Sequence, residues 1–598
     1  MAMYPTLQSV YPSQQVTDTF RGYNHNPKIA GSEFYEMTNL TSDCYPLLAN
    51  RPKRGKVKTL SAPRALLGKS QLAYIDGTSL FYGEEDLTAY LGAAGFVLSD
   101  DEAMLPKQLV SMGAYMVIFP DKLYINTENY EDCGSLEAVF STSEGSAVTY
   151  TICTADGENY GTPTVSSSAP ADPVGGALWL DTSDTIHALR IYSEQSDLWT
   201  DIATVYVKIS AAGIGTQFAD YDGVTISGAA ADDGGVLASQ LDDLNGSHVI
   251  YSRTDDSIVV VGLLDQVYTQ TTGSVTVERR VPDMDFVTEA SNRLWGCMYG
   301  LVDGETVNEI YCCALGDFKN WRRYMGISTD SYAASVGTDG PWTGAVTYLG
   351  NPIFFKETCL HKVYISASGA HQIVDTACRG VQKGSHRSLT VVGETLFYKA
   401  PGEVCAYDGS LPVSVSSNLG TVRYGEAVGG AYRDKYYLSM TDADGNAHLF
   451  VYDTLRKLWH REDDSAVQMF ASCGGELYFT DGDGTLWSVG GSAGEAEGEM
   501  QWSATTGLMG YSTVERKYIS RFNLRMMLPV GSNAEVFVQY DSDGVWHPAG
   551  SMVGRGTGTF MLPVRPRRCD HFQVRLQGTG DFRLFSFSKL FEKGSDEP

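Results

Sequence analysis

Apolar and aromatic residues recur along the chain in short hairpin patterns. From Leu72 to Tyr82, an Asp-Gly pair lies between two apolar arms, which predicts two antiparallel strands joined by a tight turn. The pattern returns from Tyr115 to Ile125, from Lys435 to Tyr452 and from Glu476 to Val489. In the second half of the chain its copies are spaced roughly 40 to 50 residues apart, the period of four-stranded propeller blades. We therefore expect an all-β fold with a β-propeller of about seven blades.

Changes in this pattern predict four parts. They are an N-terminal arm with the first strands (1–60), the propeller in two pieces (61–141 and 279–495), inserted β domains (142–278) and a C-terminal β-sandwich (496–598). A closed ring of blades has a physical advantage, because it leaves few strand edges unpaired.

The assignments of the insertion and of the C-terminal sandwich depend on the local sequence. In 142–278 aromatic residues become rare, while Trp179 and Trp199 follow a stiff proline-containing entry. These two residues predict a small core within a fibre-like module. From Val536 to Tyr540, apolar and polar residues alternate, which predicts half-buried antiparallel strands in the last part of the chain.

Charge and cysteine content restrict the function. The chain has 598 residues, with 72 acidic against 44 basic side chains and a net charge of −28. Such a field repels nucleic acid, so we expect no tight or specific DNA binding, and an acidic wall is compatible with a passage through which DNA slides. No stretch approaches the roughly 20 apolar residues of a membrane span, and we expect no membrane insertion by this chain. Its 11 cysteines include no CxxC pair and are typical of buried thiols in a reducing compartment.

Few residues suggest metal or cofactor chemistry. Asp442, Asp444 and Asn446 have the spacing that opens a calcium loop, but no Glu follows at the twelfth position. An acidic hairpin turn explains them as well. They are the weak calcium candidates of a chain for which we otherwise expect no metal and no cofactor.

Motifs for catalysis are also weak. Residues 490–494 match GxSxG, but the acidic, glycine-broken run that follows is typical of a linker and not of the helix that a nucleophile elbow requires. Residues 481–484 have the sequence Asp-Gly-Asp-Gly and differ in spacing from the Asp-boxes of sialidases, so they predict a turn. We identify no catalytic or cofactor-binding residue and expect a protein that is not an enzyme.

Basic residues form local islands in this acidic chain, at Arg51 to Arg54, Arg279-Arg280, Arg322-Arg323 and Arg565 to Arg568. They have two interpretations, solvated surface or contacts for acidic neighbours in an assembly.

Three segments resemble proteins of tailed bacteriophages. The stretch from Tyr23 to Gly55 is similar to the opening of phage tail propeller proteins. Asn292-Arg293-Leu294-Trp295, followed by Gly316-Asp317 and Asn320-Trp321, resembles the NR-x-W and GD-x-x-NW blade of nozzle, tail tubular protein B-like and head–tail stabilisation proteins. The segment from Pro170 to Trp199 is similar to small modules of phage tail and fibre proteins.

The resemblance implies a structural virion protein, assembled in the bacterial host cytoplasm. Its expected form is a homo-oligomeric ring, six-fold by analogy, that surrounds the DNA exit channel and contacts portal or adaptor and tail-fibre or tail-tip proteins. Two alternatives remain open. One is a receptor-binding or fibre-anchoring tail-tip protein that uses the insertion, and the other is a propeller glycosidase acting on host surface polysaccharide.

Overall fold

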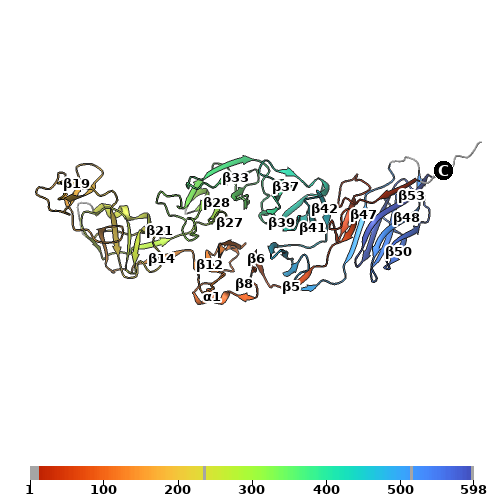
Figure 1. The fold of residues 1–598 in the computed structure, drawn as a ribbon, viewed down its shortest axis with the longest axis horizontal. Helices are drawn as coiled ribbons and strands as arrows, with labels where there is room; N and C mark the ends of the chain where they lie inside the picture. The colour runs from red at the N-terminus through yellow and green to blue at the C-terminus, as the bar shows by residue number, and fades with distance from the viewer. Residues whose placement is uncertain (1–12, 105, 233–237, 303, 512–515, 594–598) are drawn as a thin grey trace, which may run out of the picture.

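The molecule is elongated, with three groups of sheets placed one after another (Figure 1). The structure is a computed structural model that describes residues 13–104, 106–232, 238–302, 304–511 and 516–593. Within these ranges there is one α-helix, α1 (Thr88–Ala93), and almost all other regular structure is β-strand. The expected all-β class is therefore confirmed.

Six small sheets in the middle of the molecule are antiparallel meanders of four consecutive strands in the described part of the chain. The first two are β6 (Pro63–Gly68), β7 (Leu72–Asp76), β8 (Ser79–Tyr82), β9 (Glu85–Asp86), and β10 (Gln108–Met112), β11 (Tyr115–Phe119), β12 (Leu123–Asn126), β13 (Cys133–Ser135). The next two are β27 (Phe286–Glu289), β28 (Leu294–Val302), β29 (Glu305–Cys312), β30 (Tyr332–Ser335), and β31 (Gly344–Tyr348), β32 (Asn351–Phe355), β33 (Cys359–Tyr364), β34 (Gln372–Ala377). The last two are β35 (Thr390–Val392), β36 (Thr395–Ala400), β37 (Glu403–Tyr407), β38 (Val413–Ser414), and β39 (Tyr424–Tyr432), β40 (Lys435–Asp442), β41 (Ala447–Asp453), β42 (Leu458–Arg461).

A further sheet joins the two ends of this region. Its strands β43 (Met469–Cys473), β44 (Glu476–Thr480) and β45 (Thr485–Ser488) are consecutive, but the next strand is β5 (Gly55–Thr59), which also pairs with β46 (Glu495–Ala496). A strand that precedes the first meander therefore completes the last sheet. This pairing fastens residues that are more than 400 positions apart.

The first strands of these sheets contact one another in a circle. β6 contacts β10, β10 contacts β27 and β27 contacts β31, after which the 3-10 turn η3 (His386–Ser388) connects β31 with β39. β39 also contacts β35 and β43, and β43 returns to β6. Together with the meander topology, this circle is consistent with a β-propeller-like fold.

The insertion leaves and re-enters the middle region through a pair of strands, β14 (Ala138–Ser141) and β26 (Thr276–Arg279). They share a sheet with β21 (Gly223–Ser227) and β22 (Gly246–Val249). A second sheet contains β23 (Ser252–Thr254), β24 (Ser257–Val261), β20 (Tyr206–Ser210), β15 (Val148–Cys153) and β25 (Tyr268–Gln270). The third contains β16 (Thr164–Ser166), β17 (Leu178–Asp181), β18 (Ala188–Ser193) and β19 (Leu198–Asp201).

One aliphatic cluster, with residues such as Val207, Ile209 and Ile258, is the core of the insertion. Trp179 and Trp199 contact each other at 5.5 Å between ring centroids, but neither belongs to this cluster. The larger core comes from Val, Ile and Leu on alternating strand positions, because one face of each sheet is turned inward.

The C-terminal strands form two larger sheets that also recruit the N-terminal strands. One has the order β3 (Leu40–Thr41), β4 (Leu48–Asn50), β53 (Arg583–Lys593), β48 (Lys517–Leu528), β51 (Gly556–Pro563), with β1 (Ser13–Thr17) also on β53. The other has the order β2 (Phe34–Thr38), β47 (Gln501–Thr506), β52 (Phe572–Thr579), β49 (Asn533–Tyr540), β50 (His547–Val553). Both sheets contribute to one buried cluster. The N-terminal segment thus crosses the C-terminal sheets before it reaches the middle region.

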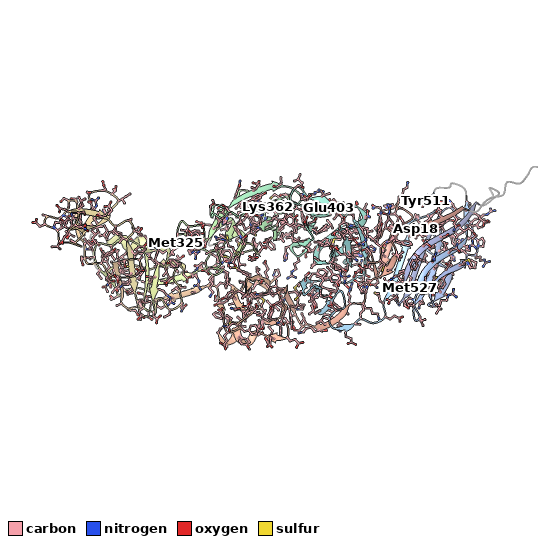
Figure 2. All side chains as sticks on the ribbon, viewed as in Figure 1. Asp18, Met325, Lys362, Glu403, Tyr511 and Met527 are labelled. Carbon is pink, nitrogen blue, oxygen red and sulfur yellow. The ribbon has the colours of Figure 1, made fainter. Side chains whose placement is uncertain are left out.

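Side chains occupy the molecule along its whole length (Figure 2). Met325 lies where the insertion meets the middle sheets, in the connection between β29 and β30 (Figure 2). Lys362 on β33 and Glu403 on β37 lie along one margin of the middle region (Figure 2).

Candidate functional site

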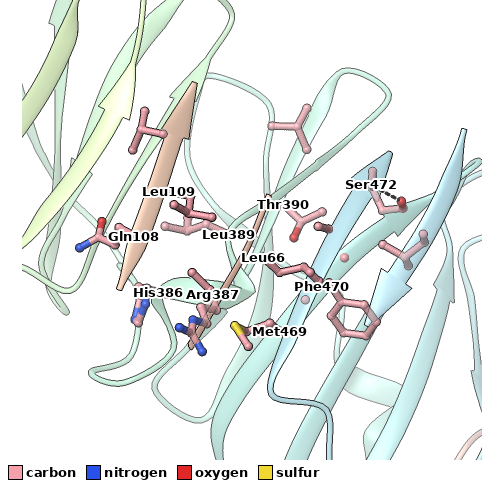
Figure 3. A pocket seen from close by; sticks show the side chains of 18 of the residues that line it. Leu66, Gln108, Leu109, His386, Arg387, Leu389, Thr390, Met469, Phe470 and Ser472 are labelled. Atoms are coloured by element: carbon pink, nitrogen blue, oxygen red, sulfur yellow. Dashed lines mark hydrogen bonds between the residues drawn. The ribbon is translucent and has the colours of Figure 1, made fainter. Parts of the chain in front are cut away.

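A cavity of about 420 Å³ lies at the centre of the circle of first strands. Its apolar wall comes from several sheets and includes Val287. Figure 3 labels five more of its apolar residues, Leu66, Leu109, Leu389, Met469 and Phe470. Its polar lining includes Lys107, Gln108, His386 and Arg387. Several of its lining residues lie in the first strands that contact one another around the circle, which is why the cavity lies within it.

Arg387 spans this central opening. It lies on η3, in the connection between β34 and β35, next to His386 (Figure 3). Its Nη1 donates to the carbonyl oxygen of Gln468 at 3.1 Å, and its Nη2 donates to the carbonyl oxygen of Arg64 at 3.3 Å. Gln468 directly precedes β43 and Arg64 lies in β6, the two sheets that follow β39 in the circle. One side chain therefore ties η3 to two other sheets of the circle.

The charge at this place is positive. Burial lowers the pKa of the Arg387 guanidinium, which still stays protonated at neutral pH because arginine is so strong a base. The pKa of His386 is lowered to about 4, first by burial and then by the Arg387 charge, so its imidazole is neutral at pH 7. Among the described residues, no Asp or Glu lines the cavity.

The other polar groups at the cavity are held by partners. Lys107 Nζ contacts both carboxylate oxygens of Asp121, at 2.6 and 2.8 Å, and both side chains are almost fully buried. Gln108 Nε2 donates to the carbonyl oxygen of Asp285 at 2.9 Å, and Gln108 Oε1 accepts from the Val287 amide at 3.1 Å. These bonds join β10 to β27 and leave Arg387 as the cation without a carboxylate at this cavity.

The calcium candidates lie in the hairpin between β40 and β41. Asp442 Oδ1 accepts from the amides of Asp444 and Asn446, both at 2.9 Å, and Oδ2 lies 2.9 Å from His448 Nε2. The His448 contact, followed by the hydrogen bonds from Asn446, holds the pKa of Asp442 well below its usual range. The carboxylate is therefore engaged within its own turn, which is the role of an acidic hairpin residue.

The Asp-Gly-Asp-Gly segment lies in the corresponding hairpin of the next sheet. Asp481 Oδ1 accepts from the amides of Asp483 and Thr485, at 3.0 and 2.8 Å, and Oδ2 accepts from Trp487 Nε1 at 2.7 Å. Both hairpins thus use an aspartate that binds the amides two and four residues later and the side chain six residues later. Across the described ranges, no group of three or more His, Cys, Asp or Glu side chains is placed to hold a metal ion.

The GxSxG match lies between β45 and β46, and no helix follows it in the described structure. Ser492 Oγ donates to Glu476 Oε2 at 2.5 Å, and the Gly490 amide donates to Glu476 Oε1 at 2.6 Å. The serine hydroxyl is bound to a carboxylate of the same sheet, and this arrangement stabilises a turn.

The basic islands differ in their surroundings. Arg51 and Arg54 are buried, and they form ion pairs with Glu462, Asp463 and Glu497 at 2.5 to 3.7 Å. These pairs lie where β5 approaches the end of β42. The expectation that this island is either solvated or available to neighbours is therefore wrong for Arg51 and Arg54, because the segment between β4 and β5 places them against acidic residues of the same chain.

The phage-like blade motif occupies buried positions. Trp295, Asn320 and Trp321 are at most 1% exposed, and Arg293 is 3% exposed. The Arg293 guanidinium donates to the carbonyl oxygens of Cys313, Ser328 and Asp330 at 2.6 to 2.8 Å. The motif therefore organises the long connection between β29 and β30.

Asn320 joins this connection to the insertion. Its Oδ1 accepts from the Gly223 amide at 2.8 Å, and its Nδ2 donates to Asp222 at 2.9 Å and to Asp317 at 2.6 Å. Asp222 also pairs with Arg279 at 2.5 Å. The motif was visible in the sequence, but its contact with the insertion was not, whereas His386 and Arg387 belong to no recognisable motif.

All eleven cysteines are unpaired, and most of them are buried. Among the described residues, no helix is both long enough and apolar enough to cross a bilayer.

No family model matches the sequence, and no curated protein is similar to it. Solved structures similar to this chain include a Trypanosoma rangeli sialidase bound to 2,3-difluorosialic acid, with 9% identity, a TM-score of 0.20, and coverage of 80% of this chain and 90% of that one. A second Trypanosoma rangeli sialidase has 8% identity and a TM-score of 0.22 over 91% of this chain and 96% of that one. TM-scores this low establish neither a common fold nor a common activity.

Proposed function

We propose that the chain is a structural protein of a bacteriophage tail, a ring-forming nozzle or tail tube component with a seven-bladed β-propeller and a C-terminal β-sandwich. The six meanders and the sheet closed by β5 support a count of seven blades, and the two C-terminal sheets with their shared core support a sandwich. The pairing of β5 with β45 joins the two ends of the proposed propeller, and this closure favours a rigid body suited to repeated packing in a particle.

The observation that carries the proposal is the role of the blade motif. The residues on which the phage resemblance depends, Arg293, Trp295, Asn320 and Trp321, are buried and hydrogen-bonded within the architecture. Shared residues with such a structural role support a common architecture and do not point to a common reaction. The central cavity, with no carboxylate among its described lining residues, also lacks the pair of acids that most glycoside hydrolases use.

In the proposed ring, DNA passes between copies and not through a propeller. The central cavity, of about 420 Å³ and crossed by Arg387, has the size of a small-molecule site and not of a DNA duplex, whose major groove alone is about 12 Å wide. The net charge of −28 keeps such a passage from binding phosphates tightly.

Electron microscopy of the purified protein, with light scattering for its mass, tests the proposal. We expect closed rings, six-fold by analogy with the resembling proteins, and the same subunit in purified particles. A chain that stays monomeric at every concentration and is absent from virions would overturn the proposal.

A second candidate function, receptor binding or fibre anchoring, is favoured by the outer face of the β16 to β19 sheet. Leu178, Leu180 and Leu189 point to the aliphatic core, so the alternate positions face the other way. On that face the rings of Tyr192 and Trp199 are 5.4 Å apart, and Asp201 pairs with Arg190 at 2.9 Å. Aromatic rings beside carboxylates are suited to binding sugars, and β19 lies at the tip of the molecule (Figure 1).

The substitution Trp199→Ala tests this candidate, with the exposed Ile186→Ala in the same module as its control. If the module binds the host, Trp199→Ala particles assemble normally but adsorb poorly, while Ile186→Ala particles adsorb as before. Equal adsorption of both would exclude this role for the outer face.

A glycan-cleavage screen addresses the glycosidase alternative, and clear turnover would overturn our proposal that the chain is not an enzyme.

A further inference from the structure

We propose that the central cavity is a binding site for a small organic anion, whose carboxylate or phosphate group contacts Arg387 and whose apolar part packs against the cavity wall. The site goes beyond the structural role proposed above and does not depend on it.

The hydrogen bonding of Arg387 is the first argument. A guanidinium has five N–H donors, and two of the Arg387 donors reach carbonyl oxygens, at 3.1 and 3.3 Å. Neutral carbonyls compensate a buried charge less well than a carboxylate does, and a planar fork suits a bidentate oxyanion. Arg387 is half-buried and faces the cavity, so an entering anion can reach it.

The charge balance of the cavity is the second argument. The lining residues include Lys107 and Arg387 but, in the described part of the chain, no carboxylate. Lys107 is neutralised by Asp121, while Arg387 is not neutralised by any lining residue. An anion would supply the missing countercharge.

The shape and the wall of the cavity define the rest of the ligand. The volume of about 420 Å³ falls in the range of small-molecule sites. Leu109, Val287 and Leu389 give it an apolar wall near the cation. This combination favours an anion with a small hydrophobic body over a highly hydrated inorganic ion.

Calorimetry with benzoate and with inorganic phosphate tests the proposal, since the two probes separate an organic carboxylate from a free phosphate. We expect saturable binding of at least one probe to the wild-type chain. The substitution Arg387→Gln keeps one donor group but removes the charge, and we expect it to weaken binding at least about tenfold. The exposed Arg423→Gln removes the same charge elsewhere and is expected to leave binding unchanged.

A measurement on the unmodified protein covers the case in which Arg387→Gln does not fold. An anion beside Arg387 offsets the charge that lowers the pKa of His386, so histidine-selective NMR should show that pKa rising from about 4 when the probe saturates the site. Absence of saturable binding by both probes, equal binding by the wild type and Arg387→Gln, or an unchanged His386 signal at saturation would overturn the proposal. Ring formation is measured separately, so the two proposals fail independently.

Discussion

Buried cations in this protein are mostly satisfied by oxygen atoms. Lys399 Nζ donates to Gln382 and to the Ala400 carbonyl, at 2.6 and 2.7 Å. Lys589 differs, because its Nζ lies 2.7 Å from the sulfur of Met509 and burial lowers its pKa to about 8. A cation held in this way costs stability, since the charged form loses water without gaining an anionic partner.

We predict that Lys589→Met stabilises the protein by about 1–3 kcal/mol at pH 7. The unfolded lysine binds its proton near pH 10.5 and the native one near pH 8, so the penalty is fully present below pH 8 and disappears as the pH rises towards 10.5. Urea denaturation at pH 7 and pH 9.5 measures it. Lys589→Arg, which keeps the charge, is the control. A variant no more stable than wild type at pH 7 would contradict this prediction.

Buried histidines make the fold sensitive to mild acid. Burial, with help from nearby cations, lowers the pKa of His460 to about 3 and that of His361 to about 4. The unfolded imidazoles titrate near pH 6.5, so the unfolded chain holds more protons between pH 6.5 and 4. The free energy of unfolding of the protein must therefore fall as the pH decreases through that window.

We predict that His460→Gln reduces this dependence by up to about 1.4 kcal/mol per pH unit. Denaturation between pH 7 and 4.5 measures the slope for the wild type and the variant. His460 interacts with the charges of Lys435, Asp43 and Asp453. The carboxylates of Asp43 and Asp453 have lowered pKa values, so their contribution is lost only below pH 4, outside the window. Identical slopes would mean that His460 does not titrate as inferred.

The strand β5 is the element on which ring closure depends. Gly55 at its start packs so closely that a Cβ atom would lie 1.8 Å from the carbonyl oxygen of Ala493. The neighbouring Lys56 is exposed. A side chain at position 55 must therefore push β5 away from β46.

We predict that Gly55→Ala lowers the free energy of unfolding by about 1–3 kcal/mol, the usual cost of overpacking. Lys56→Ala is the matched control and should change it little. Hydrogen exchange of β45 and β5 locates the effect, because an opened closure exposes their shared amides. Wild-type protection in Gly55→Ala would show that the strand tolerates the added methyl group.

The orientation of the insertion depends on a small polar junction. Asn320, Asp222 and Arg279 are buried there, and Asn320 is the residue that the middle sheets contribute. We predict that Asn320→Ala destabilises this junction by about 1–3 kcal/mol, because it leaves the Gly223 amide without its acceptor and removes the hydrogen bond to Asp222 Oδ1. Limited proteolysis between 136 and 142 should become faster, while circular dichroism stays unchanged. Equal cleavage rates would argue against this anchor.

Hairpin positions were predictable from local pattern. The hairpin predicted at Asp76-Gly77 turns at Gly77 and Thr78, directly after β7, and the segment from Asp442 to Asn446 also forms a turn. These features depend on side-chain alternation and turn chemistry within about ten residues, which the sequence displays directly. The all-β class follows from the same signals. The blade number and the sandwich remain predictions with the support described above.

The pairing of strands that are far apart in the sequence could not be predicted from local pattern. The N-terminal strands β1 to β4 pair into the C-terminal sheets, and β5 completes a sheet that begins at Met469. Arg51 and Arg54 looked like a surface island, and Arg387 belonged to no motif, because their partners are hundreds of residues away. Strand order, the direction of each buried charge and the central cavity arise from contacts between distant segments. The local sequence pattern therefore predicts strands and turns. Only the tertiary structure determines which strands become neighbours and which charges are buried.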